Sequence, residues 1–146
     1  RRWPYMGLAI FFTVPGQPHG KGRPRAARRG GFITLYTDEK TRNYESLVGE
    51  HARAAMNGFA ILATPVAVSI NAFYEIPKSW SKKKKQQAML GEIVPGKSDI
   101  DNIAKSVLDG AQSIVMTNDR NVCRLTIRKS FSYEPRVEVF VYEVLP

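Results

Sequence analysis

The stretch "KSDIDNIAKSVLDG", residues 97–110, places four ionisable side chains among apolar residues that repeat with helical spacing. At about 100° per residue, Ile100, Ile103 and Val107 share one face of a helix. That face has to pack on a core, so the spacing predicts a helix over residues 99–113. Core packing alone does not require three carboxylates and an ammonium near the start of this helix.

Two interpretations fit these charged side chains. Asp101, Lys105 and Asp109 lie one turn apart on a neighbouring face, and Asp99 stands at the helix start. Asp99 can be an N-cap while Lys105 pairs with Asp101 and Asp109, which would make all four structural. Alternatively, the carboxylates bind a hard divalent cation, with Asp119 in the turn before the next strand as a further ligand. Spacing alone leaves both interpretations open.

Patterns on either side of this helix predict an α+β domain with helices packed on a mixed sheet. Alternating or continuous apolar residues predict strands over residues 7–14, 32–37, 65–77, 121–131 and 136–144, and helical spacing predicts helices over 38–57 and 79–90. The last two strands should form an antiparallel hairpin. Phe32, Tyr36 and Tyr44 are expected in the core. The chain of 146 residues is expected to be a single domain, with residues 1–6 interpreted as a trimmed or artificially added end.

The charge of the chain predicts a polyanionic partner. Lysine and arginine give a formal net charge of +9, and nucleic acid is the usual partner of so basic a domain. Residues 15–31 form a predicted basic loop bracketed by Gly and Pro, which can follow a phosphate backbone; a solvated loop without a ligand is the alternative. The residues expected to contact DNA are Lys21, Arg23, Arg25, Arg28, Arg29 and Lys97. For Phe32, Tyr36 and Tyr44, stacking on unpaired bases is the alternative to a place in the core.

Compartment and membrane association can also be judged from the sequence. The single cysteine, Cys123, cannot form an internal disulfide, which is typical of a reducing compartment. The apolar run at residues 7–14 is too short to span a bilayer. We therefore expect a cytoplasmic protein that does not associate with membranes.

The motif "SDIDNIAKSVLDG", followed by "NDRNV", resembles the signature of the RusA family of Holliday junction resolvases. The upstream stretch "GKGRPRAARRGGFITLYTDEKTRNYE" is similar to the N-terminal part of that family. The resemblance implies a homodimeric endonuclease, bacterial or phage-encoded, that depends on Mg²⁺, accepts Mn²⁺ and cuts four-way DNA junctions by paired nicks. A metal-bound water would attack the phosphodiester and leave a 5′-phosphate.

The resemblance also implies roles for particular residues. Asp99, Asp101 and Asp119 match the family's motif aspartates and would hold the metal, and Lys105 matches its essential lysine. Asp109 matches an aspartate whose role we expect to be structural. Asn118 stands where the family commonly has an aspartate, which would lower the affinity for metal.

Three other functions compete with a junction resolvase. One is a nuclease for flaps, forks or other branched DNA. Another is a junction-binding protein with impaired catalysis, suggested by Asn118. A basic RNA-binding structural protein is the third, and it would show no metal dependence.

Overall fold

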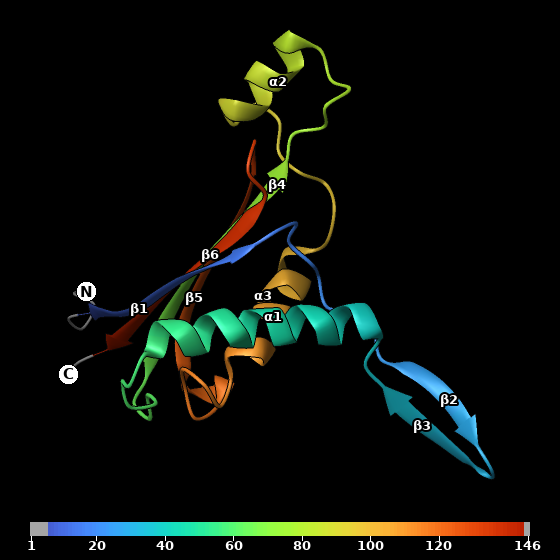
Figure 1. The fold of residues 1–146 in the computed structure, drawn as a ribbon, viewed down its shortest axis with the longest axis vertical. Helices are drawn as coiled ribbons and strands as arrows, with labels where there is room; N and C mark the ends of the chain where they lie inside the picture. The colour runs from blue at the N-terminus through green and yellow to red at the C-terminus, as the bar shows by residue number, and fades with distance from the viewer. Residues whose placement is uncertain (1–5, 145–146) are drawn as a thin grey trace.

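The computed structural model describes residues 6–144, which form the predicted α+β fold (Figure 1). The main sheet contains, in order across it, β1 (Met6–Pro15), β6 (Arg136–Val144), β4 (Val66–Glu75) and β5 (Val122–Ser132). β1 and β4 run antiparallel to β6, whereas β4 and β5 are parallel, so the sheet is mixed. Helices α1 (Glu39–Met56) and α3 (Ile100–Ala111) cover one of its faces (Figure 1). Of the end assigned to residues 1–6, all but Met6 lie outside the described residues.

The last two strands do not pair with each other, so the predicted terminal hairpin is wrong. β4 lies between β5 and β6 and is hydrogen-bonded to both. Val66, Ile70 and Ala72 of β4 are completely buried. A strand at the centre of the core needs a partner along each edge to satisfy its backbone groups. β5 becomes an edge strand instead, with the exposed cationic side chains that are typical of such edges.

The parallel pairing of β4 and β5 requires a crossover connection, which contains α3. At one end of the sheet, Lys129 late in β5 donates from Nζ to the carbonyl oxygen of Ser98, just before α3, at 2.9 Å. At the other end, the backbone N–H of Thr117, before β5, donates to the carbonyl oxygen of Leu62, before β4, at 3.0 Å. The start of α3 and the turn before β5 therefore lie at opposite ends of the sheet.

The predicted helix over residues 38–57 is confirmed as α1, and local chemistry explains both of its ends. Asp38 is the N-cap and accepts hydrogen bonds from the backbone N–H of Thr41 at 3.1 Å and from its hydroxyl at 2.7 Å. The bond from the hydroxyl is the main cause that lowers the pKa of the Asp38 carboxyl. Asn57 ends the helix with a left-handed backbone (φ 37°), and Gly58 follows with a φ of 89°.

The helix predicted over residues 79–90 is confirmed as α2 (Lys82–Met89), which lies at one end of the molecule away from α1 and α3 (Figure 1). Ser81 is its N-cap and accepts a hydrogen bond from the backbone N–H of Lys84 at 3.2 Å. Its first turn consists of lysines, and only Ala88 is buried.

A two-stranded hairpin, which we call the arm, projects from the body beside the start of α1 (Figure 1). It consists of β2 (Arg25–Arg29) and β3 (Phe32–Tyr36), so the predicted loop over residues 15–31 contains a strand. Phe32 and Tyr36 are 79% and 45% exposed, so their predicted place in the core is wrong, whereas Tyr44 is buried as expected. The reason is that neither the sheet nor the helices cover the arm.

Helices α1 and α3 approach each other at glycines, where a larger residue does not fit. A Cβ added to Gly110 would lie 2.7 Å from the Cβ of Val48 and 2.8 Å from the carbonyl oxygen of Glu45. A Cβ on Gly49 would lie 3.1 Å from the carbonyl oxygen of Gly110. These distances are shorter than ordinary carbon contacts, so the two glycines set the separation of the helices.

Replacing Gly110 by alanine should destabilise the fold, although alanine normally favours a helix. The added methyl group would overlap Val48 and the backbone of α1. We expect a loss of about 1–3 kcal/mol in the free energy of unfolding, measured by urea denaturation. Gly96→Ala is the matched control, because a Cβ there would meet nothing within 4 Å. Equal stabilities of the two variants would contradict this account of helix packing.

Candidate functional site

The start of α3 presents two carboxylates that accept no side-chain hydrogen bond and form no ion pair within residues 6–144. Asp99 occupies the N-cap position, but its side chain makes no capping hydrogen bond. Asp101 follows in the first turn, and both residues are exposed. Neither carboxylate forms an ion pair with another residue in the range 6–144. The interpretation of the Asp99 side chain as a cap is therefore wrong.

Lys105 lies one helical turn after Asp101, and its side chain is exposed. If the charged side chains of α3 were only structural, Lys105 would form ion pairs with Asp101 and Asp109. Within the described part of the chain its ammonium has no ion-pair partner, because Asp109 binds a different lysine. Two anionic groups and one cationic group at the start of α3 are thus available to a ligand.

Lys21 is the lysine that binds Asp109. Its Nζ lies 2.5 Å from Oδ2 of Asp109 on α3 and 3.2 Å from Oε1 of Glu45 on α1. The hydrogen bond to Asp109 is the largest contribution to the raised pKa of the Lys21 ammonium. These two carboxylates compete with DNA for the Lys21 ammonium, and the contact of Lys21 with DNA stays a prediction. The ion pair with Lys21 also gives Asp109 the structural role expected of it.

The backbone before α3 is held from two sides. The ammonium of Lys129 binds the carbonyl oxygen of Ser98, whose φ of 64° lies in the left-handed region. On the other side the backbone N–H of Lys21 donates to the carbonyl oxygen of Asn102 at 2.9 Å. A Cβ on Gly20 would lie 3.1 Å from the Ser98 side chain, so this segment packs closely on the loop. The position of Asp99 is thus fixed by its surroundings.

The structure does not bring Asp119 to the other two aspartates. Asp119 begins a 3-10 turn, η1 (Asp119–Asn121), directly before β5. Lys129, which reaches Ser98, lies seven strand positions after Val122, the first residue of β5. At about 3.3 Å per residue, these seven steps extend roughly 23 Å. The expected convergence of the three aspartates therefore does not occur within one chain, and no three His, Cys, Asp or Glu residues among 6–144 are grouped to hold a metal ion.

Asn118 has a local task in this turn. Its side-chain oxygen accepts a hydrogen bond from the backbone N–H of Arg120 at 2.9 Å, which caps η1. An aspartate at this position could make the same bond. Having Asn118 in place of an aspartate therefore removes no metal ligand from the Asp99–Asp101 pair of the same chain.

Asp99 and Asp101 nevertheless offer a donor set that suits Mg²⁺. This ion is usually bound through one or two carboxylates, with waters and substrate phosphate oxygens completing its octahedral shell. Both carboxylates are exposed and free of competing cations in the described chain. The pair can therefore begin such a site within one chain, and further oxygen ligands can come from water, substrate or another protein group.

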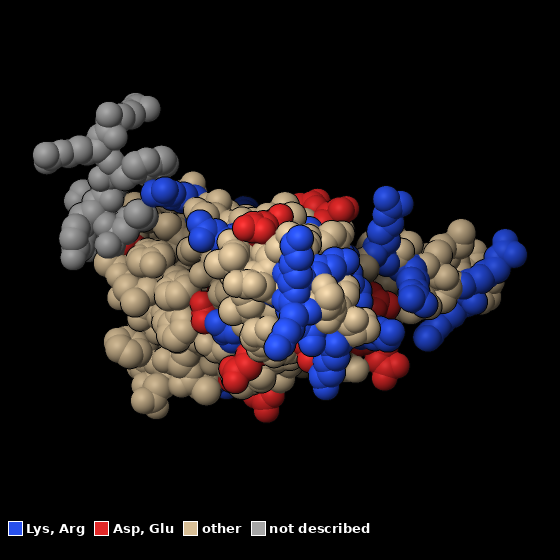
Figure 2. All heavy atoms as spheres, turned by 90° about the horizontal axis from the view of Figure 1, so that it is seen from above, with Lys and Arg blue, Asp and Glu red and all other residues tan. Residues whose placement is uncertain are grey.

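Exposed cations lie along the arm and directly before α3. Arg23, Arg25, Arg28 and Arg29 on and before the arm are exposed, as is Lys97 before α3. Figure 2 shows basic side chains along the arm and over the end of the molecule that carries α2. Their contact with DNA stays a prediction, as does that of Lys21.

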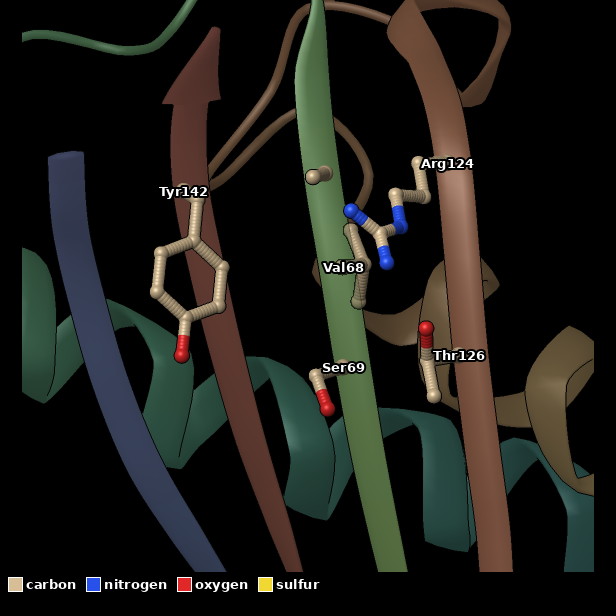
Figure 3. A pocket seen from close by; sticks show the side chains of 6 residues that line it. Val68, Ser69, Arg124, Thr126 and Tyr142 are labelled. Carbon is tan, nitrogen blue, oxygen red and sulfur yellow. The ribbon is translucent and has the colours of Figure 1, made fainter. Parts of the chain in front are cut away.

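A separate hollow lies on the face of the sheet that α1 and α3 leave uncovered (Figure 3). Ser69, Arg124, Thr126 and Tyr142 line it from three adjacent strands, and its lining includes no carboxylate. It lies near the start of β4, whereas Asp99 lies near the opposite end of the sheet. The hollow is therefore not part of the carboxylate site.

Comparison with known proteins identifies the family. Residues 15–142 match the family model described as "Endodeoxyribonuclease RusA". The chain belongs to the RusA family. A relative named "Uncharacterized protein YqaN", from Bacillus subtilis (strain 168), is 36% identical over 141 residues, which cover 92% of this chain and 96% of that protein.

Family membership confirms the resemblance seen in the motifs and indicates an endodeoxyribonuclease that acts on branched DNA. No helix among residues 6–144 has the length and apolar character needed to cross a membrane.

Three contributors to the RusA site region are not evident from the sequence. Glu45 and Lys129 hold Lys21 and the loop before α3, and Arg42 on α1 faces the arm. Arg42 lies within the stretch "YTDEKTRNY" that resembles the family, but its neighbours are known only once the arm is placed. No spacing signal distinguishes these residues from other exposed charges.

Lys21→Met should destabilise the fold at neutral pH by about 1–2 kcal/mol, because Glu45 and Asp109 then face each other without a cation. The raised pKa of Lys21 means that its contribution is complete below the ordinary value of 10.5 and is lost as the pH rises through the higher folded value. Urea denaturation of both proteins should show a constant difference near neutral pH that narrows at alkaline pH.

Lys105→Met is the matched control for this prediction, since it removes an ammonium that has no ion pair in the described chain. It should change stability by less than about 0.5 kcal/mol. Equal effects of the two substitutions would show that the contacts of Lys21 do not stabilise the fold.

Proposed function

We propose that this RusA-family protein is a Mg²⁺-dependent, structure-selective endonuclease that resolves four-way DNA junctions by paired nicks, with Mn²⁺ able to replace Mg²⁺. Family membership supports the nuclease class. One observation carries the proposal: within residues 6–144, Asp99, Asp101 and Lys105 on the first half of α3 have no ion-pair partner, whereas Asp109 on the same helix is paired with Lys21.

Charge explains why this arrangement suits DNA cleavage. The protein has a net charge of +9, and an approaching phosphate backbone is attracted to its cationic surface. Two bare carboxylates at the point of contact would repel that backbone. A divalent cation between them and the phosphate turns this repulsion into attraction, which makes Asp99 and Asp101 useful only with a metal. Mg²⁺, when bound, neutralises charge on the attacked phosphate and lowers the pKa of a coordinated water.

Lys105 contributes a fixed positive charge one turn from Asp101. A lysine ammonium is a compact point charge that stabilises the negative charge developing on phosphate oxygens. Because it has no internal ion pair in the described chain, its charge is not offset by a neighbouring carboxylate. We assign Asp99 and Asp101 to metal binding and Lys105 to the scissile phosphate.

The cationic residues would orient the DNA on this site. Arg23, Arg25, Arg28 and Arg29 are exposed on and just before the arm, and Lys97 is exposed just before α3. Their positions match a backbone contact, and binding should weaken with salt by a log–log slope of about −0.9 for each phosphate neutralised.

A homodimer would explain both the symmetry of the substrate and the place of Asp119. A four-way junction has twofold symmetry, which a C2 dimer matches with two equivalent sites. Asp119 matches a motif aspartate of the family but lies far from Asp99 in its own chain. In the proposed dimer, the Asp119 carboxylate of one chain joins the Asp99–Asp101 pair of the other.

Asp101→Asn should reduce cleavage of a synthetic four-way junction by about 100-fold or more, because it removes a metal ligand. Binding to the same junction without Mg²⁺ should be unchanged or tighter, since the substitution removes a charge that repels phosphate. Gel assays of cleavage and binding test both parts, and flaps and linear duplex run in parallel test the preference for junctions.

The matched control is Asp109→Asn, which removes a carboxylate from the same helix. This variant should lose stability through Lys21 but keep cleavage at temperatures where it remains folded. Joint loss of binding and cleavage in Asp101→Asn would instead give Asp101 a structural role. Absence of cleavage by the unaltered protein with either metal would refute the nuclease proposal.

Mixing Asp101→Asn chains with Asp119→Asn chains tests the shared site. If each site takes Asp119 from the partner, a mixed dimer has one doubly altered site and one site with every carboxylate. The mixture should then nick junctions on one strand, although neither variant cuts alone. If each site lies within one chain, every site in the mixture is altered and no nicking appears, which would contradict the shared arrangement.

A further inference from the structure

The register of the arm gives it two chemically different faces. Residues directly opposite each other in an antiparallel pair share a face, and successive residues along a strand alternate between faces. Arg25 is paired with Tyr36, and Arg29 with Phe32, so two guanidinium groups and two aromatic rings share what we call the cationic face. The other face carries Ala26, Arg28, Ile33 and Leu35.

The cationic face borders a hollow of about 440 Å³ against Arg42 in the first turn of α1. The residues that line this hollow are Ala27, Arg29, Thr34, Tyr36 and Arg42. Two guanidinium groups thus flank one aromatic ring and one hydroxyl, and no carboxylate belongs to the lining. This donor-rich composition suits an anionic ligand that also has a flat apolar surface.

Carboxylates occur only at the base of the arm. A neighbouring hollow there includes Asp38 and Glu39 together with Arg25, Lys40 and the same Tyr36 and Arg42. The Asp38 carboxylate is already engaged by the backbone and hydroxyl of Thr41 at the start of α1. Tyr36 and Arg42 thus line both hollows, and the one without carboxylates is the one that Arg29 also lines.

A nucleic-acid strand has both properties that this lining suits, which are negative charge and flat apolar surfaces. Its phosphates can accept paired hydrogen bonds from guanidinium groups, and its bases can stack on an aromatic ring. Stacking on Tyr36 requires an exposed base face, which a continuous duplex does not offer. The base stack is interrupted where DNA branches, so a base is exposed there at lower cost than within a duplex, and the proposed substrate of this protein is branched.

We infer that the cationic face of the arm, with Arg42 of α1, binds a single-stranded or unpaired stretch of DNA. This inference rests on the proposed function for its choice of DNA as the ligand. Arg29 and Arg42 bind successive phosphates of this stretch, and Tyr36 stacks on one of its bases. Arg28 lies on the opposite face, so its proposed contact is with the duplex arms of the junction and not with the unpaired stretch. The arm thus distinguishes a branch point from continuous duplex.

Two adjacent arginines provide the sharpest test, because Arg28 and Arg29 have the same charge on opposite faces of one strand. Binding is measured by fluorescence anisotropy with labelled oligo(dT) of about 12 nucleotides and with a duplex of equal length, in EDTA. Arg29→Ala and Arg42→Ala should each weaken binding of oligo(dT) roughly tenfold, and Arg28→Ala should weaken it less than about twofold.

Tyr36 variants test the stacking contact separately. Tyr36→Leu should weaken binding of oligo(dT) roughly tenfold with little effect on the duplex, and Tyr36→Phe should retain it because the ring remains. Circular dichroism and thermal unfolding of each variant show whether it is folded. If Tyr36→Phe binds as weakly as Tyr36→Leu, the stacking role is overturned.

Other outcomes overturn the inference as a whole. Equal losses for Arg28→Ala and Arg29→Ala would mean that the arm attracts DNA only through its total charge. If Leu35→Ser changes the oligomeric state and no variant of the cationic face affects oligo(dT), the arm is a contact between copies of the chain.

The junction cleavage assay distinguishes failure of this inference from failure of the proposed function. A protein that binds oligo(dT) through Arg29 but never cuts junctions would keep the inference and lose the nuclease assignment. If the protein cuts junctions but Arg28→Ala and Arg29→Ala weaken oligo(dT) binding equally, the nuclease assignment is kept and the inference about the arm is lost.

Discussion

The ion cluster formed by Lys21, Glu45 and Asp109 organises the functional end of this protein. One ammonium joins the segment before the arm to α1 and α3, and the same segment bonds through its backbone to Asn102. The cluster places the base of the arm beside the start of α3. In this cluster Asp109 is paired with Lys21, so its carboxylate does not neutralise Lys105. The free charges at the start of α3 are therefore a consequence of how the neighbouring charges are paired.

The helices and their ends could be predicted from the sequence because the causes are local. Apolar spacing in α3 and the cap at Asp38 depend on residues a few positions apart. The order of strands depends on the whole core. Because β4 is buried and needs two partners, β6 joins one edge and β5 the other, and the turn between the last two strands does not produce a hairpin.

The same error in strand order explains the misplaced Asp119. A helix that connects two parallel strands runs opposite to them, so its first residues lie at the carboxyl ends of both strands. Asp99 and Asp101 therefore lie where ligands commonly bind in parallel sheets. Asp119 directly precedes β5, so it lies at the opposite end of the sheet, at the amino ends of these strands. Motif spacing alone could identify these aspartates but could not indicate which of them share an end of the sheet.

In the arm, strand geometry places on opposite faces two charges that are adjacent in the sequence. As a loop, the run "RRGGF" would be one basic patch beside a core aromatic residue. As a hairpin, it places Arg29 and Phe32 on one face and Arg28 on the other. The exposed ring of Tyr36 then lies next to guanidinium groups instead of in the core. Because side chains alternate between the faces of a strand, Arg28 and Arg29 meet different surroundings. The face with Arg29 offers aromatic rings as well as guanidinium groups, so in our proposal it suits bases as well as phosphates.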